Sequence, residues 1–343
     1  MAHSEEDLDL QPDDQYDGID KGQDYKEDFN PLTILIRLIE NIAELDKSKI
    51  KWGSVVSLFI STILAFIGGF LMITFESCWQ TLVFTFLYTI CAGLGITMGA
   101  HRYWSHRSFK AAWPVQLVLM LMNCIAFQES IFTWSHKHRV HHKWSDTDRD
   151  FTNSRRGGFF AHVGWKMYEE HCEVSVGRKL ICVKDLCADP VVVFQHTYYY
   201  LLSVPMAFII PAVIPWLFWG EILEYAIYVT FFRLFVTFNL TWCVNSIGHM
   251  YGDRPHDVTS YTFDNSVFSQ FVLGEGQLNF HHSYPCDYRG SEDNNHLIGN
   301  FTTTIIDLLA VLHLVWDRKR VSREQIMARR RRTGDLGNTV PRY

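Results

Sequence analysis

The chain has 343 residues, of which 48% are apolar and only 20% are charged, and it contains 25 Phe and 11 Trp. This composition excludes collagen, a long coiled coil, a disordered hub and a small disulfide-stapled secreted domain. The formal net charge of −6 is unevenly distributed, because residues 1–30 are acidic and residues 317–332 are basic, and it does not indicate a nucleic-acid partner. Eight cysteines without a CxxC pair are predicted to be reduced.

The chain divides into three parts by composition. Residues 1–50 are predicted to be an acidic N-terminus and pre-membrane segment, and residues 1–30 within it to be disordered, because they contain few branched apolar side chains. Residues 51–335 are predicted to form one membrane domain. Residues 336–343 are left as a C-terminal tail.

Four runs in the membrane domain are almost free of charge and have the length that a helix needs to cross a bilayer, about 20 residues. They cover residues 54–74, 79–99, 198–219 and 222–244. The links within each pair are short, so the spans are expected to form two helical hairpins in an all-α integral membrane protein. A fifth apolar stretch, residues 111–127, is shorter and carries Pro114, and it is predicted to lie in or dip into the membrane interface.

Positive charge predicts the orientation of the spans. The links inside the two hairpins contain no Lys or Arg, whereas residues 1–53, 100–197 and 245–343 contain 6, 13 and 11 of them. Both termini are therefore expected to face the cytoplasm. Residues 100–197 and 245–335 would then form a helical cap on that side.

Histidines form four clusters, each just beyond a predicted span or within the predicted cap. Residues 138, 141 and 142 stand at helical positions i, i+3 and i+4, and Asn245 and His249 are also four apart, so the side chains within each of these two clusters share a helix face. The clusters comprise His101 and His106; His138, His141 and His142; Asn245 and His249; and His281 and His282.

Imidazole ligands suit iron or zinc, whereas carboxylate and water ligands suit magnesium or calcium. Eight imidazoles and one amide oversupply a single tetrahedral zinc, so two metal ions are predicted. Seven of the eight other histidines are expected to be ordinary solvated side chains: His3, His162, His171, His196, His256, His296 and His313.

Five stretches resemble the membrane-bound acyl-CoA desaturases of the stearoyl-CoA delta-9 type, and the resemblance covers roughly residues 50–335. They are GAHRYWSHRSFKA (99–111), HRVHHKWSDTD (138–148), NSRRGGFFAHVGW (153–165), TWCVNSIGHMYGDRPHD (241–257) and GEGQLNFHHSYPCDY (274–288). The fold implied is four transmembrane helices below a cytoplasmic cap with a dimetal site.

The resemblance implies oxygen-dependent desaturation of a long-chain fatty acyl-CoA at a diiron centre in the endoplasmic reticulum membrane. Electrons would come from cytochrome b5 and its reductase, as separate proteins. Carried over by position, the iron ligands would be His101, His106, His138, His141, His142, His249, His281 and His282, with Asn245 acting through a water.

Five further positions are candidates for contact with the acyl-CoA. Trp242 matches a family position near the substrate, and Arg155 and Arg156 match a pair that either contacts substrate or organises the cap. Thr89 and Gly93 are small residues near the expected end of the acyl tunnel, where they would admit a longer chain. Helix packing explains small residues in spans equally well.

Three departures from the family pattern bear on activity. The family's third histidine box reads GEGxHNxHH, and Leu278 stands where its first His would bind metal. Glu169 and Glu170 occupy positions where the family commonly has Arg and Lys near CoA. His136 and Lys137 replace an Arg-Asp pair before the second box.

Three alternatives to an active desaturase stay open at this point. The first is a paralogue that has lost catalysis and serves as a lipid-binding or regulatory membrane protein. The second is a diiron enzyme that hydroxylates or acts on another acyl lipid. The third, a zinc-dependent hydrolase, is disfavoured because no HExxH motif accompanies the histidines.

Overall fold

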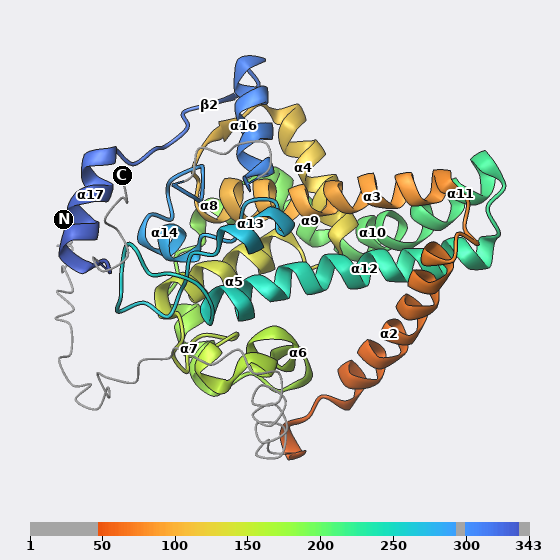
Figure 1. The fold of residues 1–343 in the computed structure, drawn as a ribbon, viewed down its shortest axis with the longest axis horizontal. Coiled ribbons are helices and arrows are strands. Elements are labelled where there is room, and N and C mark those ends of the chain that lie inside the picture. Colours follow the sequence, from red (N-terminus) through yellow and green to blue (C-terminus); the bar gives the residue numbers. More distant parts are fainter. Residues whose placement is uncertain (1–46, 293–298, 336–343) are drawn as a thin grey trace, which may run out of the picture.

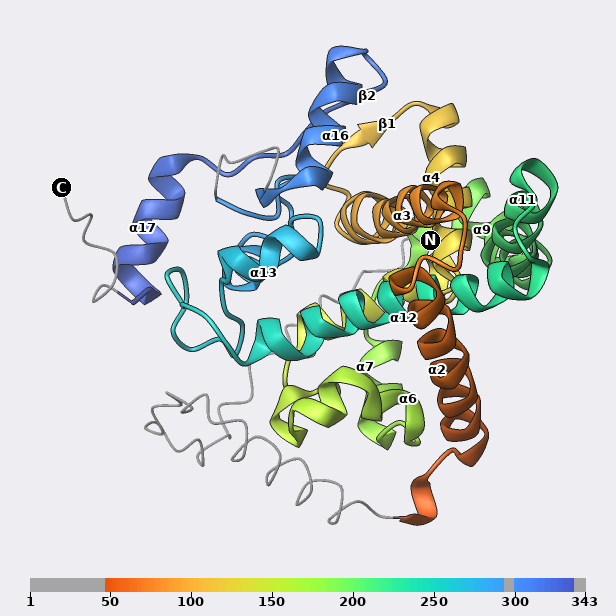
Figure 2. The same cartoon turned by 45° about the vertical axis from the view of Figure 1, so that its right-hand side comes forward.

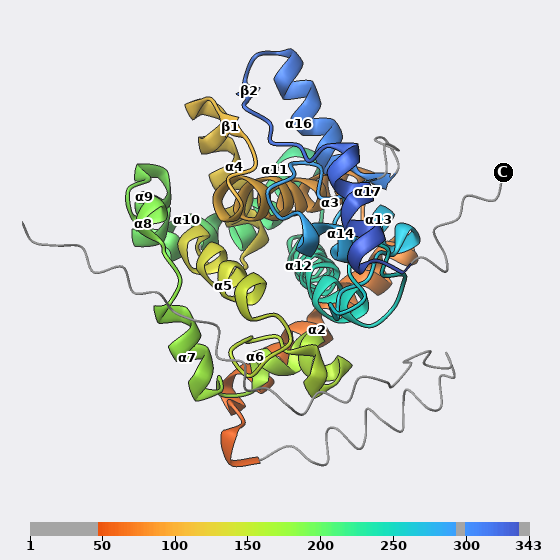
Figure 3. The ribbon, with the colours of Figure 1, turned by 90° about the vertical axis from the view of Figure 1, so that its left-hand side faces the viewer.

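The computed structural model describes residues 47–292 and 299–335, which form helices, connecting loops and one two-stranded sheet (Figure 1). The predicted disorder of residues 1–30 and the predicted tail fall outside these residues. Short helices gather at one end of the long helices, and the α11–α12 and α2–α3 links lie at the other end (Figures 1 and 3).

Among the described residues, four helical segments are long and apolar enough to cross a membrane, which agrees with the number of predicted spans. The second and fourth segments continue past their predicted ends, to Ser105 and His249. The segments are α2 (Trp52–Ile73); α3 (Trp79–Leu94) with η2 (Gly95–Ser105); α10 (Tyr199–Val204), η5 (Pro205–Ile209) and α11 (Ile210–Trp219); and α12 (Leu223–Ser246) with η6 (Ile247–His249).

Helix α2 packs against α12 near one end and diverges from it toward the other (Figures 1 and 2). Gly68 permits the close approach, since a Cβ at this position would lie 2.1 Å from the Tyr228 carbonyl oxygen. No larger residue fits there without moving one helix. The divergence leaves room between the two helices, and a pocket occupies it.

The predicted interfacial stretch is helical, as α4 (Trp113–Ala126). It is followed at once by α5 (Ile131–Trp144), and the two axes are bent by 82°. The turn between them uses left-handed backbone at Phe127 and Glu129, with φ of 54° and 75°. Ser130 then caps α5 by accepting a hydrogen bond from the Thr133 amide. The bend points α5 toward the ends of η2 and α12.

The remaining elements are short and surround the ends of η2, α5 and α12 (Figure 3). Strand β1 (Lys110–Ala111) pairs antiparallel with β2 (Val315–Trp316) and joins α4 to α16. A core centred on the buried Trp104 packs η2 against α4, α9 and α16. The short helices are η1 (Lys47–Lys49), η3 (Ser154–Arg156), η4 (Phe160–Gly164), α6 (Trp165–Met167), α7 (Cys172–Lys179), α8 (Lys184–Cys187), α9 (Pro190–Thr197), α13 (Ser266–Phe271), α14 (Leu278–Ser283), α16 (Phe301–Val311) and α17 (Arg323–Thr333).

Candidate metal centre and its pocket

The eight predicted ligand histidines converge, and they do so in two groups. Within each group the ring nitrogens lie within 4.8 Å of one another. The first, here the five-histidine group, contains His101, His106, His138, His142 and His281. The second, the three-histidine group, contains His141, His249 and His282.

A π-helical segment, η2, brings His101 and His106 together. The His106 amide donates to the His101 carbonyl at 3.2 Å, a bond between residues five apart, and the two ring centroids are 4.9 Å apart. In an α-helix, with 3.6 residues per turn, residues five apart point in different directions. The π-helical turn therefore aligns this pair. The sequence spacing alone did not predict it.

Helix α5 supplies both groups from one face, as its i, i+3, i+4 spacing predicted. His138 and His142 enter the five-histidine group and His141 the three-histidine group. Helix α14 divides its pair in the same way, with His281 in the first group and His282 in the second. The two groups are consequently held side by side by the same two short helices.

Facing ring nitrogens in the five-histidine group are separated as metal ligands are. The Nε2 atoms of His101 and His281 are 2.8 Å apart, and those of His142 and His281 are 3.0 Å apart. The His106 and His138 Nε2 atoms are 2.9 Å apart. Adjacent ligands on bonds of about 2.1 Å are roughly 3.0 to 3.4 Å apart, and the separations here are at or slightly below the lower end of that range, so this group can hold one metal ion after a small expansion.

Three of the imidazoles are held at their second nitrogen by a carboxylate. His101 Nδ1 lies 2.9 Å from a Glu275 oxygen, and His141 Nδ1 lies 2.9 Å from Asp150. The third pair joins His249 Nδ1 to Asp146 at 3.1 Å. Such contacts orient a metal-binding ring and leave Nε2 free for the metal.

Glu275 also binds Arg102, which is buried and donates to Tyr288, Thr303 and Asn300 as well. Burial alone raises the pKa of the Glu275 carboxyl, but Arg102 and His101 outweigh it and lower the pKa to about 2. The carboxylate is therefore ionised at neutral pH. Glu275, Asp146 and Asp150 were not predicted as site residues, although each lies in or beside a histidine motif.

The three-histidine group contains an orphaned donor atom. His249 is buried, and its Nε2 has no hydrogen-bond partner among the described residues, although its Nδ1 faces Asp146. A buried polar atom without a partner is costly, and a metal ion would satisfy it. The donor set of this group thus also fits a metal.

The rings without a carboxylate partner are in the protonation state that metal binding requires, whereas the pKa of the His141 ring is raised because Asp150 and Asp146 outweigh burial. Burial holds the pKa values of His106, His281 and His282 well below the usual range, and neighbouring positive charges, mostly those of other imidazoles, lower them further. These rings are therefore neutral at physiological pH. Only neutral imidazole offers a lone pair to a metal.

Leu278 is buried beside the three-histidine group. It begins α14, so it stands one turn before His281 and His282, on the same side of the helix. Its side chain packs against Gly248, next to His249: a Cβ at this glycine would be 2.8 Å from a Leu278 methyl carbon. The position that carries a histidine in the family motif is apolar here.

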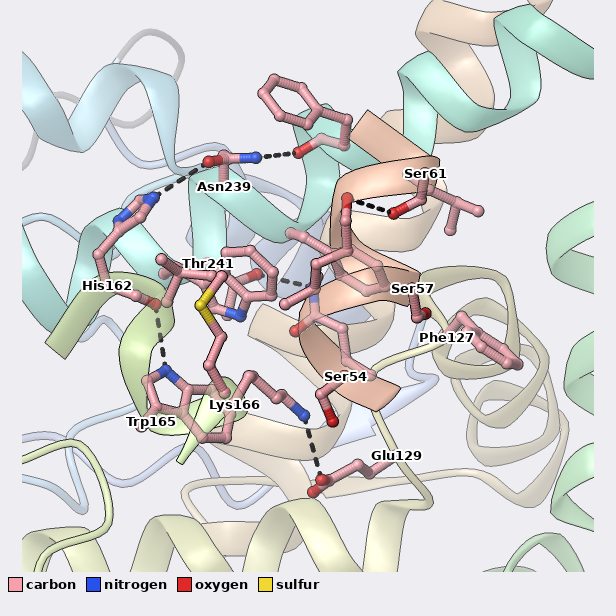
Figure 4. A pocket seen from close by; sticks show the side chains of 18 of the residues that line it. Ser54, Ser57, Ser61, Phe127, Glu129, His162, Trp165, Lys166, Asn239 and Thr241 are labelled. Carbon is pink, nitrogen blue, oxygen red and sulfur yellow. Dashed lines mark hydrogen bonds and ion pairs between the residues drawn. The ribbon is translucent and has the colours of Figure 1, made fainter. Parts of the chain in front are cut away.

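A pocket of about 670 Å³ adjoins both groups and runs between α2, α5 and α12. Its wall includes His138 of the five-histidine group and His141 of the three-histidine group, together with Asn245 and Trp242. Much of the remainder is aromatic, formed by Phe127, Phe208, Phe231, Phe235 and Phe238. Figure 4 shows its polar side, where His162 connects Trp165 to Asn239 through hydrogen bonds. The shape and lining suit a long apolar ligand.

The other predicted substrate residues do not line this pocket. Thr89 donates to the Thr85 carbonyl within its own helix, and Gly93 lies against Leu273. Arg155 and Arg156 contact aromatic rings, those of Tyr261 and Phe160.

Of the two glutamates near the predicted CoA end, Glu170 is partly neutralised by an ion pair. Glu170 accepts from Arg178 at 2.7 Å, and the Glu169 amide donates to the Lys49 carbonyl at 2.9 Å. The expected repulsion between Glu170 and an anionic ligand is therefore reduced.

The prediction that His256 is solvated is wrong. It is completely buried, with its Nε2 3.6 Å from Asp264 and 3.5 Å from Glu292, because residues 253–264 fold back over α14. His162 is also partly buried. His171, His196 and His313 are exposed as predicted, and His3 and His296 fall outside the described residues.

Comparison with known proteins gives matches to fatty acid desaturases. The fatty acid desaturase family model matches residues 77–288. The Delta(9)-fatty-acid desaturase fat-7 of Caenorhabditis elegans is 43% identical over 281 residues, 82% of each chain. The stearoyl-CoA desaturase of Homo sapiens is 46% identical over 72% of this chain and 69% of its own, and that of Sus scrofa is 44% identical over 74% and 71%.

These matches confirm the resemblance carried by the five histidine-rich and neighbouring motifs. They extend well beyond those motifs, because they cover most of the membrane domain. The chain therefore belongs to the fatty acid desaturase family, a family of oxidoreductases, and within it to the stearoyl-CoA delta-9 desaturase group.

Proposed function

We propose that this chain introduces a double bond at the delta-9 position of a long-chain fatty acyl-CoA. The reaction uses O2, two irons, and electrons from cytochrome b5 and its reductase. The observation that carries the proposal is the meeting of two imidazole groups with a long, mostly aromatic pocket. The names of the relatives supply the reaction type and the position of the double bond.

The five-histidine group would hold one iron. The three-histidine group would hold the other, with Asn245 contributing through a water. When bound, the irons supply the oxygen chemistry needed to break an unactivated C–H bond, which side-chain acids and bases cannot do. Glu275, Asp146 and Asp150 keep the rings that they contact in one tautomer and one orientation.

The pocket would position the acyl chain and keep water out. Aromatic side chains from α12 and from the α4–α5 turn bury the chain, and this burial is the main source of binding free energy. His138, His141 and Asn245 line the wall, so a chain lying along it passes the metal groups. Trp242 supports the wall beside them through its stacked contact with Phe238.

Other predicted substrate contacts remain proposals. Arg155 and Arg156, beside the histidine boxes, would contact the CoA end or organise the loop that carries it. Thr89 and Gly93 would set the room at the methyl end of the acyl chain.

The membrane arrangement is part of the proposal. Four spans in two hairpins would cross the endoplasmic reticulum membrane, with both termini and the metal-bearing cap on the cytoplasmic side. The absence of Lys and Arg from residues 75–78 and 220–221, and their abundance elsewhere outside the spans, supports this orientation. Membrane lipid would surround the apolar outer faces of α2 and α11.

The test is a reconstituted assay with stearoyl-CoA, cytochrome b5 and its reductase, together with elemental analysis of the purified protein. Iron in the protein and a delta-9 monounsaturated product, identified by mass spectrometry, are expected. His141→Ala should abolish turnover, while the matched change at an exposed histidine, His171→Ala, should not. A hydroxylated product, or iron-loaded protein without any turnover, would contradict the proposal.

A further inference from the structure

The turn between α4 and α5 fixes a carboxylate on the wall of the acyl pocket. Glu129 has left-handed backbone, φ 75°, which is uncommon for a residue other than glycine and persists only where the surroundings impose it. Its amide donates to the Tyr199 hydroxyl at 2.9 Å, and the preceding Gln128 donates to Thr241 at 2.9 Å. The turn is thereby tied to α10 and α12.

The Glu129 carboxylate forms ion pairs with two ammonium groups at once. A single oxygen, Oε1, accepts from Lys137 at 2.8 Å and from Lys166 at 3.2 Å; Figure 4 draws the second contact. The two lysines come from different helices, α5 and α6, and both ammonium groups lie over the Trp165 ring. Burial alone raises the pKa of Glu129, but the two lysines outweigh it and lower the pKa.

These three side chains are the only Lys, Arg, Asp or Glu residues that line this pocket in the described part of the chain. Without Glu129, two ammonium groups would face an otherwise mostly apolar cavity. Such a pair binds a carboxylate strongly, because charge-assisted hydrogen bonds gain strength away from water. Lys137 lies on α5, the helix that also brings His138 and His141 to the wall of this pocket.

We infer that Glu129 is a specificity-determining residue that fills the anion position between Lys137 and Lys166 and thereby selects against free fatty acids. A fatty acid and its thioester or ester carry the same apolar chain. They differ at the carbonyl carbon, which belongs to an anionic carboxylate in the fatty acid and to an uncharged group in the thioester or ester. Discrimination between them requires a feature that disfavours the anion. The inference rests on the proposed function, since it takes the pocket to be the acyl site.

Binding of two matched lipids tests this role. Radiolabelled stearate and methyl stearate are bound at pH 8 to the full-length protein, immobilised in nanodiscs. Glu129→Gln should bind stearate about tenfold more tightly than the wild type and leave methyl stearate within about twofold. Glu170→Gln is the matched control, because that carboxylate is 4.0 Å from Lys137 but does not line the pocket. It should change neither affinity.

Two further variants keep the test decisive. In Glu129→Gln/Lys166→Met, the gain for stearate should disappear because one ammonium group is lost. If Glu129→Gln fails to fold, Glu129→Asp withdraws the carboxylate from both lysines and should give a smaller gain of the same sign. Unchanged stearate affinity, or an equal change for both lipids, would overturn the inference.

Turnover of stearoyl-CoA, measured separately, distinguishes the two proposals. If the wild type desaturates stearoyl-CoA but Glu129→Gln does not alter the ratio of the two affinities, only the role of Glu129 fails. If the ratio shifts as expected but no desaturation occurs, only the proposed function fails.

Discussion

Replacement of Leu278 by histidine should strengthen metal binding at the three-histidine group. Leu278 lies at the start of α14, one turn before His282, and packs against the glycine next to His249. An imidazole there would lie beside His249, whose Nε2 has no hydrogen-bond partner among the described residues. Leu278→His should therefore add a fourth imidazole to a group that now has three.

The expected gain can be estimated from known effects around metal ligands. Loss of a group that merely supports a ligand costs about 10- to 100-fold in metal affinity, so gain of a direct ligand should bring at least that much. This corresponds to about 1.4 to 2.8 kcal/mol. Without metal, the new imidazole is a buried polar group lacking a partner, which costs about 1 to 3 kcal/mol. Metal-free Leu278→His protein should thus melt below the wild type, and saturating metal should bring the two melting temperatures close together.

The assay is dialysis of iron-loaded protein against graded chelator, with the metal remaining per chain measured by elemental analysis. The wild type should lose one iron at a lower chelator concentration than the other, whereas Leu278→His should retain both to higher concentrations. Leu278→Ile, which conserves volume and apolarity, is the control and should behave as the wild type. Equal retention of two irons by all three proteins would refute the reasoning, because it would mean that the group already has its full set of ligands.

Three other substitutions test the surroundings of the site. Asp146→Asn should weaken metal retention in the three-histidine group about 10- to 100-fold, measured by the same dialysis, because His249 loses its anionic partner. Glu275→Gln should lower stability by about 3 to 5 kcal/mol, seen as a fall in Tm, because it leaves the buried Arg102 without its counter-charge. Arg233→Ala should cost about 1 to 3 kcal/mol, since the carbonyls of residues 125 and 207 lose their buried donors, and an unchanged Tm would contradict that assignment.

The number of spans and the grouping of the histidines were predictable because both depend on patterns local in sequence. A bilayer requires about twenty uncharged residues in a row, whatever the rest of the chain does. The i, i+3, i+4 spacing of His138, His141 and His142 aligns them on any α-helix. That the two groups contain five and three members was not predictable, because α5 and α14 each divide their histidines between them.

Contacts between segments that are distant in sequence could not be predicted from such local patterns. Glu275 contacts His101 although the two residues are far apart in sequence, and no sequence pattern near either residue indicates this contact. The same holds for His256, whose burial depends on how residues 253–264 fold over α14. The π-helical turn at His101 and His106 was not predicted for a different reason. Helices are predicted from apolar residues that recur every 3.6 positions, and this spacing does not indicate a π-helical turn. The eight histidines thus converge as predicted, whereas the carboxylates that contact them were not predicted as site residues.

The unequal size of the two histidine groups is offset by an unequal share of carboxylates. In the five-histidine group one ring, His101, faces a carboxylate, whereas in the three-histidine group both His141 and His249 do. A carboxylate at Nδ1 makes the ring a stronger donor at Nε2 and prevents it from turning away. The smaller group therefore has fewer ligands, but a larger fraction of them is fixed and electron-rich. This predicts that the three-histidine group retains metal despite Leu278, and that loss of Asp146 harms it more than loss of Glu275 harms metal retention by the five-histidine group.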